Sequence, residues 1–443
     1  MRIIAAFIAC LAIFAVLKLA VGFIPVAWLQ PSLESSVATL VSEGESNGRL
    51  IADEPTTQMD NYTTALVLNM CASDHGNLLE NAFASWHHIA SGSGANAEVA
   101  ALAELVAGDV PADSPAWASY ARSWNGEIAL IKPLLIVLDL AGIRVLFTLA
   151  AFALLLAGAI ALGRATSALG GFAYALSFAI VLLPVATMSL SLAFTFLIAL
   201  AATLYTIRVS RSKGLQADAW AAPFFVFGAL TAFFDMLCTP LITLGIPLGV
   251  LIFLEAERCR NMPTSTLAAF MAAVLISWAA GYGLCWAADW VIATIVLGWD
   301  VIGDAIAQLS MRTSASGIGS EAIRQWSGLS ANIGALPIAV WVVLAVAVGG
   351  GIIAAIALRG RIRPVNARAI VLLAIVAALP FLWYLVTANH SYVHFWFTYR
   401  AQVVAIICIL MALLVAFGPE HRRQREAREH QTQHLVQEPI YFG

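Results

Sequence analysis

Long apolar segments dominate this sequence and leave very few folds open to it. A helix that crosses the hydrocarbon core of a membrane needs about 20 apolar residues, and the backbone must satisfy its own hydrogen bonds there. Segments of this kind recur ten times, at 3–29, 141–162, 168–188, 190–207, 219–237, 239–255, 265–286, 335–358, 367–388 and 399–418. The sequence therefore predicts an all-α integral membrane protein with about ten transmembrane helices.

The composition excludes the soluble classes of protein. Hydrophobic residues make up 61% of the 443 residues and charged residues only 11%, whereas a soluble chain has about 25% charged residues. A cytosolic enzyme, a secreted disulfide scaffold and a nucleic-acid-binding module are all excluded. The six cysteines show neither disulfide nor metal-site spacing, so we expect them to be small core residues.

The basic residues are distributed unevenly between the two sides of the predicted spans. One side carries 15 of the 23 Lys and Arg residues, including those of the C-terminal tail, and the other side carries six. Cytoplasmic loops hold the excess of positive charge, so both termini are predicted to be cytoplasmic. Residues 1–29 are interpreted as a retained first helix, because the segment is too long for a signal peptide and contains Lys18.

The predicted spans divide the chain into four parts. Residues 30–140 form a large extracytoplasmic loop with 14 of the 26 acidic residues, and apolar residues at helical spacing within 33–41, 79–89 and 99–106 predict short amphipathic helices. Residues 141–418 form a polytopic membrane domain of about nine helices with a second outer loop at 287–334. Residues 419–443 form a cytoplasmic tail.

Two carboxylates stand out by their position at the outer ends of apolar segments. Asp60 precedes the apolar run 65–70; it either caps a helix or takes a proton from an acceptor hydroxyl as a general base. Asp235 lies in a turn between two predicted spans, where burial is unfavourable unless the carboxylate is paired or hydrated, and turn capping is the alternative. Lys18 lies within the first span and needs an anionic partner, for which Asp60 or Asp235 could serve.

Isolated basic residues at the outer boundary suggest recognition of a phosphate. Lys132, Arg144 and Arg400 each lie beside apolar sequence, and guanidinium groups match phosphate oxygens well; contact with bulk lipid is the alternative. His390 and His394 are spaced to share a helix face, but their aromatic surroundings favour an interfacial loop over a metal site. No metal and no other cofactor is predicted, and a divalent cation stays an open alternative.

The layout resembles the GT-C fold of membrane glycosyltransferases. In that superfamily, a first span leads into a long outer loop with interfacial helices and a catalytic aspartate, and the donor is a polyprenyl-phosphate-linked sugar. The resemblance implies Asp60 as the catalytic base, with Asp74 as a second possibility. The paired Asp-x-Asp of metal-dependent members is absent, because Asn61 follows Asp60.

Five shorter phrases look like an uncharacterised family of bacterial polytopic membrane proteins that is met with cell-surface polysaccharide genes. They are Met59–Thr63, Phe234–Leu237, Gly281–Trp286, Met311–Ser314 and His390–Arg400. All five fall on or near the outer side of the predicted topology. This resemblance implies a multi-pass protein of the bacterial cytoplasmic membrane, with one outward-facing site.

The function expected from these observations is transfer of a sugar from a polyprenyl-phosphate-linked donor to a cell-envelope glycan or lipid acceptor on the outer face. Arg400, with Lys132 and Arg312, would hold the donor phosphate. The acceptor or sugar would be oriented by Asp235, His390, His394 and Tyr399. Two alternatives are a flippase or transporter of lipid-linked sugars and a non-catalytic assembly protein.

Overall fold

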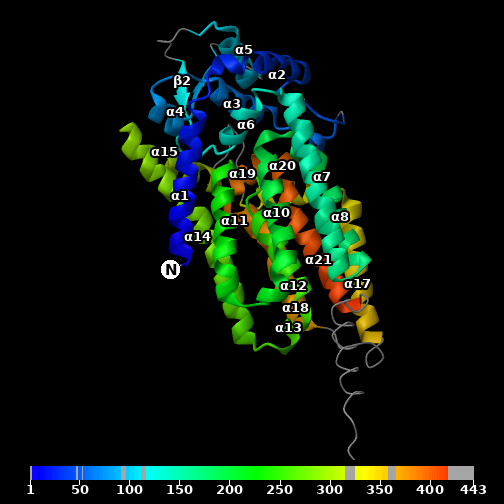
Figure 1. Ribbon diagram of the computed structural model, residues 1–443. Helices are drawn as coiled ribbons and strands as arrows, with labels where there is room; N and C mark the ends of the chain where they lie inside the picture. Colours follow the sequence, from blue (N-terminus) through cyan, green and yellow to red (C-terminus); the bar gives the residue numbers. More distant parts are fainter. Residues whose placement is uncertain are drawn as a thin grey trace, which may run out of the picture.

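The fold is described from a computed structural model for residues 2–45, 48–51, 53–90, 96–110, 116–314, 325–357 and 366–417. Within these ranges the chain is almost entirely helical, with a single two-stranded sheet, so it is an all-α membrane protein. The helices form an elongated bundle, and the described residues between 26 and 139 cover one end of it (Figure 1). We refer to these residues as the cap.

Seven helices of the described chain are long and apolar enough to cross a membrane. They are α1 (Arg2–Val21), α7 (Leu140–Ala165), α10 (Leu190–Lys213), α11 (Ala217–Phe234), α14 (Thr264–Leu297), α18 (Ala367–Val386) and a final segment (Phe395–Phe417) made of α20 (Phe395–Thr398), η3 (Tyr399–Gln402) and α21 (Val403–Phe417). An eighth span results if α16 (Ser327–Ala335) and α17 (Ile338–Ala357), which meet at 88°, are taken together.

Two of the ten predicted spans correspond to shorter helices. They are α8 (Ala168–Ile180) and α12 (Ile242–Leu254), each 13 residues long, or about 20 Å at the rise of an α-helix. Every residue of α12 is buried, and α10, α18 and α21 pack around it. Seven or eight spans are therefore supported by length, and the expected count of about ten stays a prediction.

A close contact between α11 and α14 fixes the position of the site described below. A Cβ atom added to Gly228 would lie 2.2 Å from the Trp278 carbonyl, and one added to Gly281 would lie 2.0 Å from the Phe225 carbonyl. Small residues of this kind allow two membrane helices to approach backbone to backbone. The end of α11 therefore lies directly against the middle of α14.

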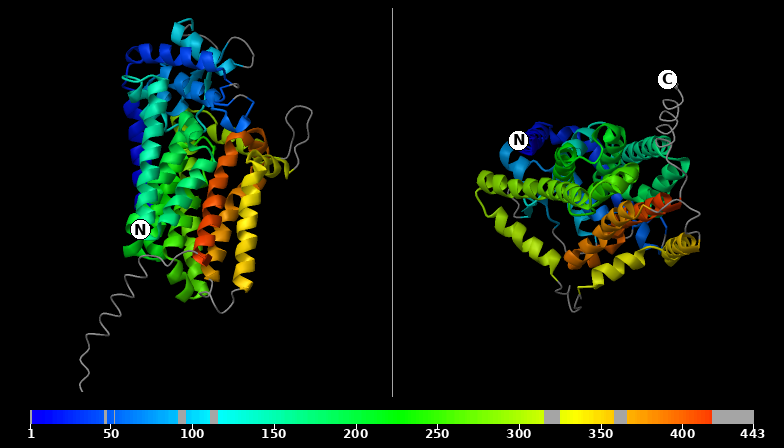
Figure 2. Two further views of the ribbon diagram at one scale, coloured as in Figure 1. Left: turned by 90° about the vertical axis from the view of Figure 1, so that its right-hand side faces the viewer. Right: turned by 90° about the horizontal axis from the view of Figure 1, so that it is seen from below.

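The cap contains most of the short helices that the sequence predicts. The helices predicted from apolar periodicity within 33–41 and 99–106 are confirmed as α2 (Gln30–Glu43) and α5 (Ala97–Ala107). Helix α3 (Asn61–Ala72) follows Asp60. The cap also contains α4 (Leu78–Ala84) and α6 (Ile128–Leu134). In the side view of Figure 2, α2 lies across the end of the bundle.

The prediction of one helix over residues 79–89 is wrong in its second half. α4 ends at Ala84, Ser85 takes a left-handed conformation with φ 47°, and Trp86–His88 form strand β1. This strand pairs antiparallel with β2 (Trp117–Ser119), with Trp86 opposite Ser119. The paired residues are 29 to 33 positions apart in the sequence, so local periodicity could not reveal the strand.

The membrane domain differs from the prediction most clearly in α14. The predicted span ends at residue 286, but α14 continues for about three more turns, to Leu297. It is followed by the amphipathic helix α15 (Val301–Thr313). Short helices complete the description: η1 (Val26–Trp28), η2 (Pro55–Thr57), α9 (Leu183–Met188), α13 (Ala256–Asn261) and α19 (Ala388–Val393). The predicted tail 419–443 lies outside the described residues.

Candidate ligand-binding site beneath the cap

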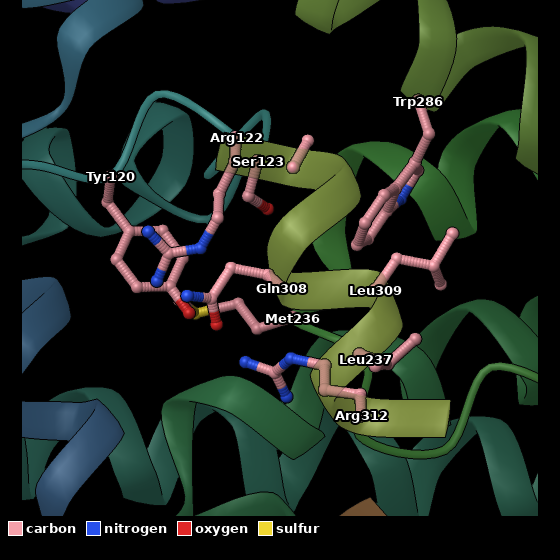
Figure 3. A pocket seen from close by; sticks show the side chains of 10 residues that line it. Tyr120, Arg122, Ser123, Met236, Leu237, Trp286, Gln308, Leu309 and Arg312 are labelled. Atoms are coloured by element: carbon pink, nitrogen blue, oxygen red, sulfur yellow. The ribbon is translucent and has the colours of Figure 1, made fainter. Parts of the chain in front are cut away.

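A small cavity lies where the cap, the α11–α12 turn, α14 and α15 meet. Its volume is about 50 Å³, and since one water needs about 10–15 Å³ of such space, it holds a few waters or a group of similar size. Figure 3 shows the side chains around it. The lining residues are Tyr120, Arg122, Ser123, Met236, Leu237, Trp286, Ala305, Gln308, Leu309 and Arg312.

Two arginines supply the positive charge of this cavity. Arg122 follows β2, stacks its guanidinium 3.9 Å from the centre of the Tyr120 ring and pairs with Asp304 at 3.3 Å. Arg312 reaches the cavity from the last turn of α15. Both guanidinium groups point into the space beside Gln308 (Figure 3), an arrangement that suits an anionic oxygen-rich group.

His390 connects Arg312 to the α11–α12 turn. Its Nε2 lies 2.8 Å from the Leu237 carbonyl and therefore donates to it, which leaves Nδ1 to accept from Arg312 at 3.0 Å. Burial, and then the nearby His394 and Arg312, hold the pKa of His390 well below its usual value. His390 is thus a neutral positioning group with both nitrogens engaged, and the lone pair of Nδ1 is already used by Arg312.

His394 lies one helical turn from His390, with the two ring centres 4.7 Å apart. It stacks on Phe397, and burial together with Arg312 lowers its pKa to about 4. Within the described residues, no group of three His, Cys, Asp or Glu side chains is arranged to hold a metal ion. The predicted pair therefore lies in aromatic surroundings next to Arg312.

Asp235 follows the last residue of α11 and directly precedes Met236 and Leu237, which line the cavity. Oδ1 accepts hydrogen bonds from the Cys238 amide at 2.9 Å and from Thr195 at 3.3 Å, so the predicted turn capping is present. Oδ2 is buried without a hydrogen-bond partner. Burial raises the pKa of Asp235 to about 7, against the effect of those hydrogen bonds.

Glu127 approaches Asp235 from the cap. Gly126 donates its amide to the Phe233 carbonyl at 2.8 Å, and a Cβ at Gly126 would lie 2.3 Å from the Phe233 ring, so only glycine allows this approach. Glu127 is 1% exposed and both of its carboxylate oxygens lack a hydrogen-bond partner. Burial raises its pKa to about 8, although Lys18 opposes this effect.

Lys18 belongs to this group of charges, with partners that differ from the predicted ones. It interacts electrostatically with Asp289 of α14 and with Glu127, and its Nζ lies 3.5 Å from the Ser85 hydroxyl. The expectation that Asp60 or Asp235 would neutralise Lys18 is therefore wrong. The reason is the length of α14: its extra turns bring Asp289 to the same level as Lys18.

Asp60, the predicted catalytic base, caps α3. Its Oδ1 accepts from the Thr63 amide at 3.1 Å, and its Oδ2 accepts from the Ser191 hydroxyl at 2.6 Å. Its own amide donates to Ser189 at 2.8 Å. Both carboxylate oxygens are thus engaged, and Asp60 fastens the cap to α10.

The other predicted phosphate-binding residues lie away from the cavity. Arg400 is fully buried and donates to the Thr56 carbonyl at 2.7 Å, while the Tyr399 hydroxyl lies 3.4 Å from the same carbonyl. Lys132 is buried in α6, in electrostatic contact with Cys71. Arg144 pairs with Glu43 at 2.7 Å. The structure brings together Asp235, Arg312, His390 and His394 of the predicted set.

Four residues of this region were missed as candidates from the sequence: Arg122, Glu127, Tyr282 and Trp286. The Tyr282 hydroxyl lies beside the Asp235 carboxylate and interacts with it, and Trp286 follows Tyr282 by one helical turn on the same face of α14. The helical spacing of Trp278, Tyr282 and Trp286 was a usable signal. No such sequence signal marks Arg122 and Glu127, because their positions depend on how the cap folds.

Comparison with known proteins finds no matching family model, no matching curated protein and no matching solved structure.

Proposed function

We propose that this protein is a membrane glycosyltransferase of the GT-C type, with about ten spans, that uses a polyprenyl-phosphate-linked sugar on the outer face of a bacterial cytoplasmic membrane. The observation that carries the proposal is the buried Oδ2 of Asp235, which lacks a hydrogen-bond partner, in the residue that directly precedes Met236 and Leu237 of a cavity with two arginines. A base next to a cationic pocket is what transfer from a phosphate leaving group needs. The cap then faces the cell envelope, and the acceptor is an envelope glycan or lipid.

The step involves one proton and one leaving group. Asp235 Oδ2 takes the proton of the acceptor hydroxyl while the acceptor oxygen forms a bond to the anomeric carbon of the sugar. The bond from that carbon to the phosphate oxygen breaks, and polyprenyl phosphate leaves with the electron pair. Arg312 and Arg122 stabilise the charge that develops on the phosphate.

Asp235 replaces Asp60 as the proposed base because of its hydrogen bonding. A base needs an oxygen within reach of the proton that it removes. Both oxygens of Asp60 already accept hydrogen bonds, whereas Oδ2 of Asp235 accepts none. A pKa of about 7 also suits a base that works near neutral pH.

Turnover of polyprenyl-phosphate-linked sugars by purified protein in detergent tests the proposal. A panel of donors and deacylated envelope acceptors is incubated with wild type, Asp235→Asn and, as control, Asp300→Asn, which changes an exposed carboxylate at the start of α15. We expect Asp235→Asn to lower release of polyprenyl phosphate about 10²- to 10⁴-fold and the control to keep the wild-type rate. Unchanged turnover in Asp235→Asn would refute the assignment of the base.

A flippase for lipid-linked sugars is the second candidate, favoured by the ionisable side chains of Lys18 and Asp289, which interact electrostatically inside membrane-spanning helices. Ionisable groups at such positions are common in transporters. The two functions separate in detergent, where a transferase turns over and a flippase shows no product. Movement of donor lipid across sealed vesicles without chemical change would establish the flippase instead.

A further inference from the structure

A long apolar groove runs along the membrane-facing side of the bundle, apart from the site described above. Its volume is about 920 Å³. Its walls come from α7, α10 and α11, which pack in a row with α1 beside α11 (Figure 1). It reaches from Leu130 of the cap to Lys213 at the far end of α10 and Arg2 at the start of α1.

Most of the groove is lined by aliphatic and aromatic side chains, so its middle suits hydrocarbon. Phe147, Phe194 and Phe234 line it near the cap, and Leu154, Ile198 and Val226 line it further along. Ala201 and Ala222 line the floor of the groove, and their small side chains do not fill it. A wall of this composition has no hydrogen bonds to offer to a polar molecule.

The end remote from the cap has a different chemistry, because charged groups gather there. Lys213 donates to the Tyr205 hydroxyl at 2.7 Å and to the Ala219 carbonyl at 3.1 Å, and since an ammonium has three donors, one is left for a ligand oxygen. Its Nζ lies 5.2 Å from the centre of the Trp220 ring. Arg2 is exposed at the same end of the groove.

One acid, Asp218, also lines this end. It lies in the first turn of α11, where the partial positive charge of the helix N-terminus balances a carboxylate. Arg2 and Lys213 are thereby left as the cations that can attract an anion. The two ends of the groove therefore differ: one is cationic at the membrane surface, and the other is apolar beneath the cap.

We propose that this groove binds one anionic phospholipid from the leaflet on the side of the termini, with its phosphate headgroup between Arg2 and Lys213 and its acyl chains along α7, α10 and α11. Basic pockets between membrane helices on the cytoplasmic side recognise anionic headgroups in this way. The site is independent of the proposed transferase chemistry, because the cations lie at the opposite end of the bundle from Asp235 and Arg312.

Native mass spectrometry of the full-length protein tests the proposal with phosphatidylglycerol and phosphatidylcholine of equal chain length. The double variant Arg2→Gln/Lys213→Gln removes both cations. The matched control Arg208→Gln/Arg211→Gln removes two exposed cations of the same end of α10 that do not line the groove. A third variant, Ala201→Trp, keeps the cations and fills the exposed, apolar floor of the groove.

We expect wild type and control to retain one phosphatidylglycerol at about tenfold lower lipid concentration than phosphatidylcholine. The double variant should lose this preference, and Ala201→Trp should lose the bound lipid. Equal retention of both lipids by wild type, or equal loss in the control pair, would overturn the proposal. Stable co-purification of a polyprenyl phosphate in place of the phospholipid would overturn it as well.

Discussion

Replacing Asp60 by alanine separates its role as a helix cap from a role in catalysis. The change removes the cap of α3, which is worth about 0.5–2 kcal/mol, and the acceptor of the Ser191 hydroxyl, worth about 0.5–1.5 kcal/mol. We therefore expect Asp60→Ala to lower the free energy of unfolding by roughly 1–3.5 kcal/mol. Asp60→Asn should lose much less, because asparagine caps helices about as well as aspartate.

Unfolding can be measured through the reactivity of the cysteine thiols. All six are buried and unpaired, so a thiol-reactive fluorescent dye reports unfolding in detergent as the protein is heated. Asp300→Ala serves as the control, since Asp300 caps helix α15 by accepting a 2.7 Å hydrogen bond from the Gly303 amide of the same helix.

The thermal unfolding midpoints of wild type, Asp60→Ala and Asp300→Ala decide between the two roles of Asp60. A loss of 1 kcal/mol moves the midpoint by about 2–4 °C in a domain of moderate size. Asp60→Ala should therefore move it by several degrees, and by more than Asp300→Ala does. A midpoint equal to that of wild type, with transfer activity abolished, would refute the structural role and restore Asp60 as the base.

Three further predictions concern stability in the same assay. Gly281→Ala should lower the free energy of unfolding by about 1–3 kcal/mol through overpacking, while Gly283→Ala, whose added Cβ would meet nothing within 4 Å, should leave it unchanged or raise it by up to about 1 kcal/mol; equal midpoints would contradict the close α11–α14 contact. Arg144→Met should cost about 1–3 kcal/mol, because it leaves the partly buried carboxylate of Glu43 without its ion-pair partner and Asn61 Oδ1 without its donor, and a double-mutant cycle with Glu43→Gln that shows no coupling would refute this. Glu127 has a pKa raised to about 8 from the ordinary 4.5, so its folded form binds the proton more tightly, and the protein should lose stability as pH rises from about 4.5 to 8; Glu127→Gln should flatten that dependence between pH 6 and 8, and an unchanged pH slope in the variant would argue against the buried carboxylate.

The membrane class and the helical cap follow from patterns that are local in the sequence. Apolar run lengths predict the long helices, and periodicity predicts α2 and α5. Asp60 as a cap was one of two interpretations that the sequence left open, and the structure shows the capping hydrogen bond. Apolar run length, helical periodicity and helix capping each depend on residues that are close together in the sequence, so they can be predicted from the sequence.

The partners of charged residues could not be predicted because they depend on tertiary packing. Lys18 was expected to meet Asp60 or Asp235, and it meets Asp289 and Glu127 instead. Arg400 and Lys132 were expected at the phosphate, and Arg400 instead holds the Thr56 carbonyl. Which of several similar cations faces a cavity is decided by the rotation of each helix, and a ring of apolar residues around a helix carries little information about that rotation.

The placement of Lys18 has a consequence for the order in which this protein is assembled during synthesis. α1 is made first, yet its window of membrane-spanning residues is only 17% buried, and hydrophobicity alone does not bind one helix to another within lipid. The charged partner on α14 lies 271 residues further along the chain, from Lys18 to Asp289. α1 can pack on α11 through Phe14 and Phe233 before α14 is made, whereas the interaction of Lys18 with Asp289 forms only after α14 has been inserted.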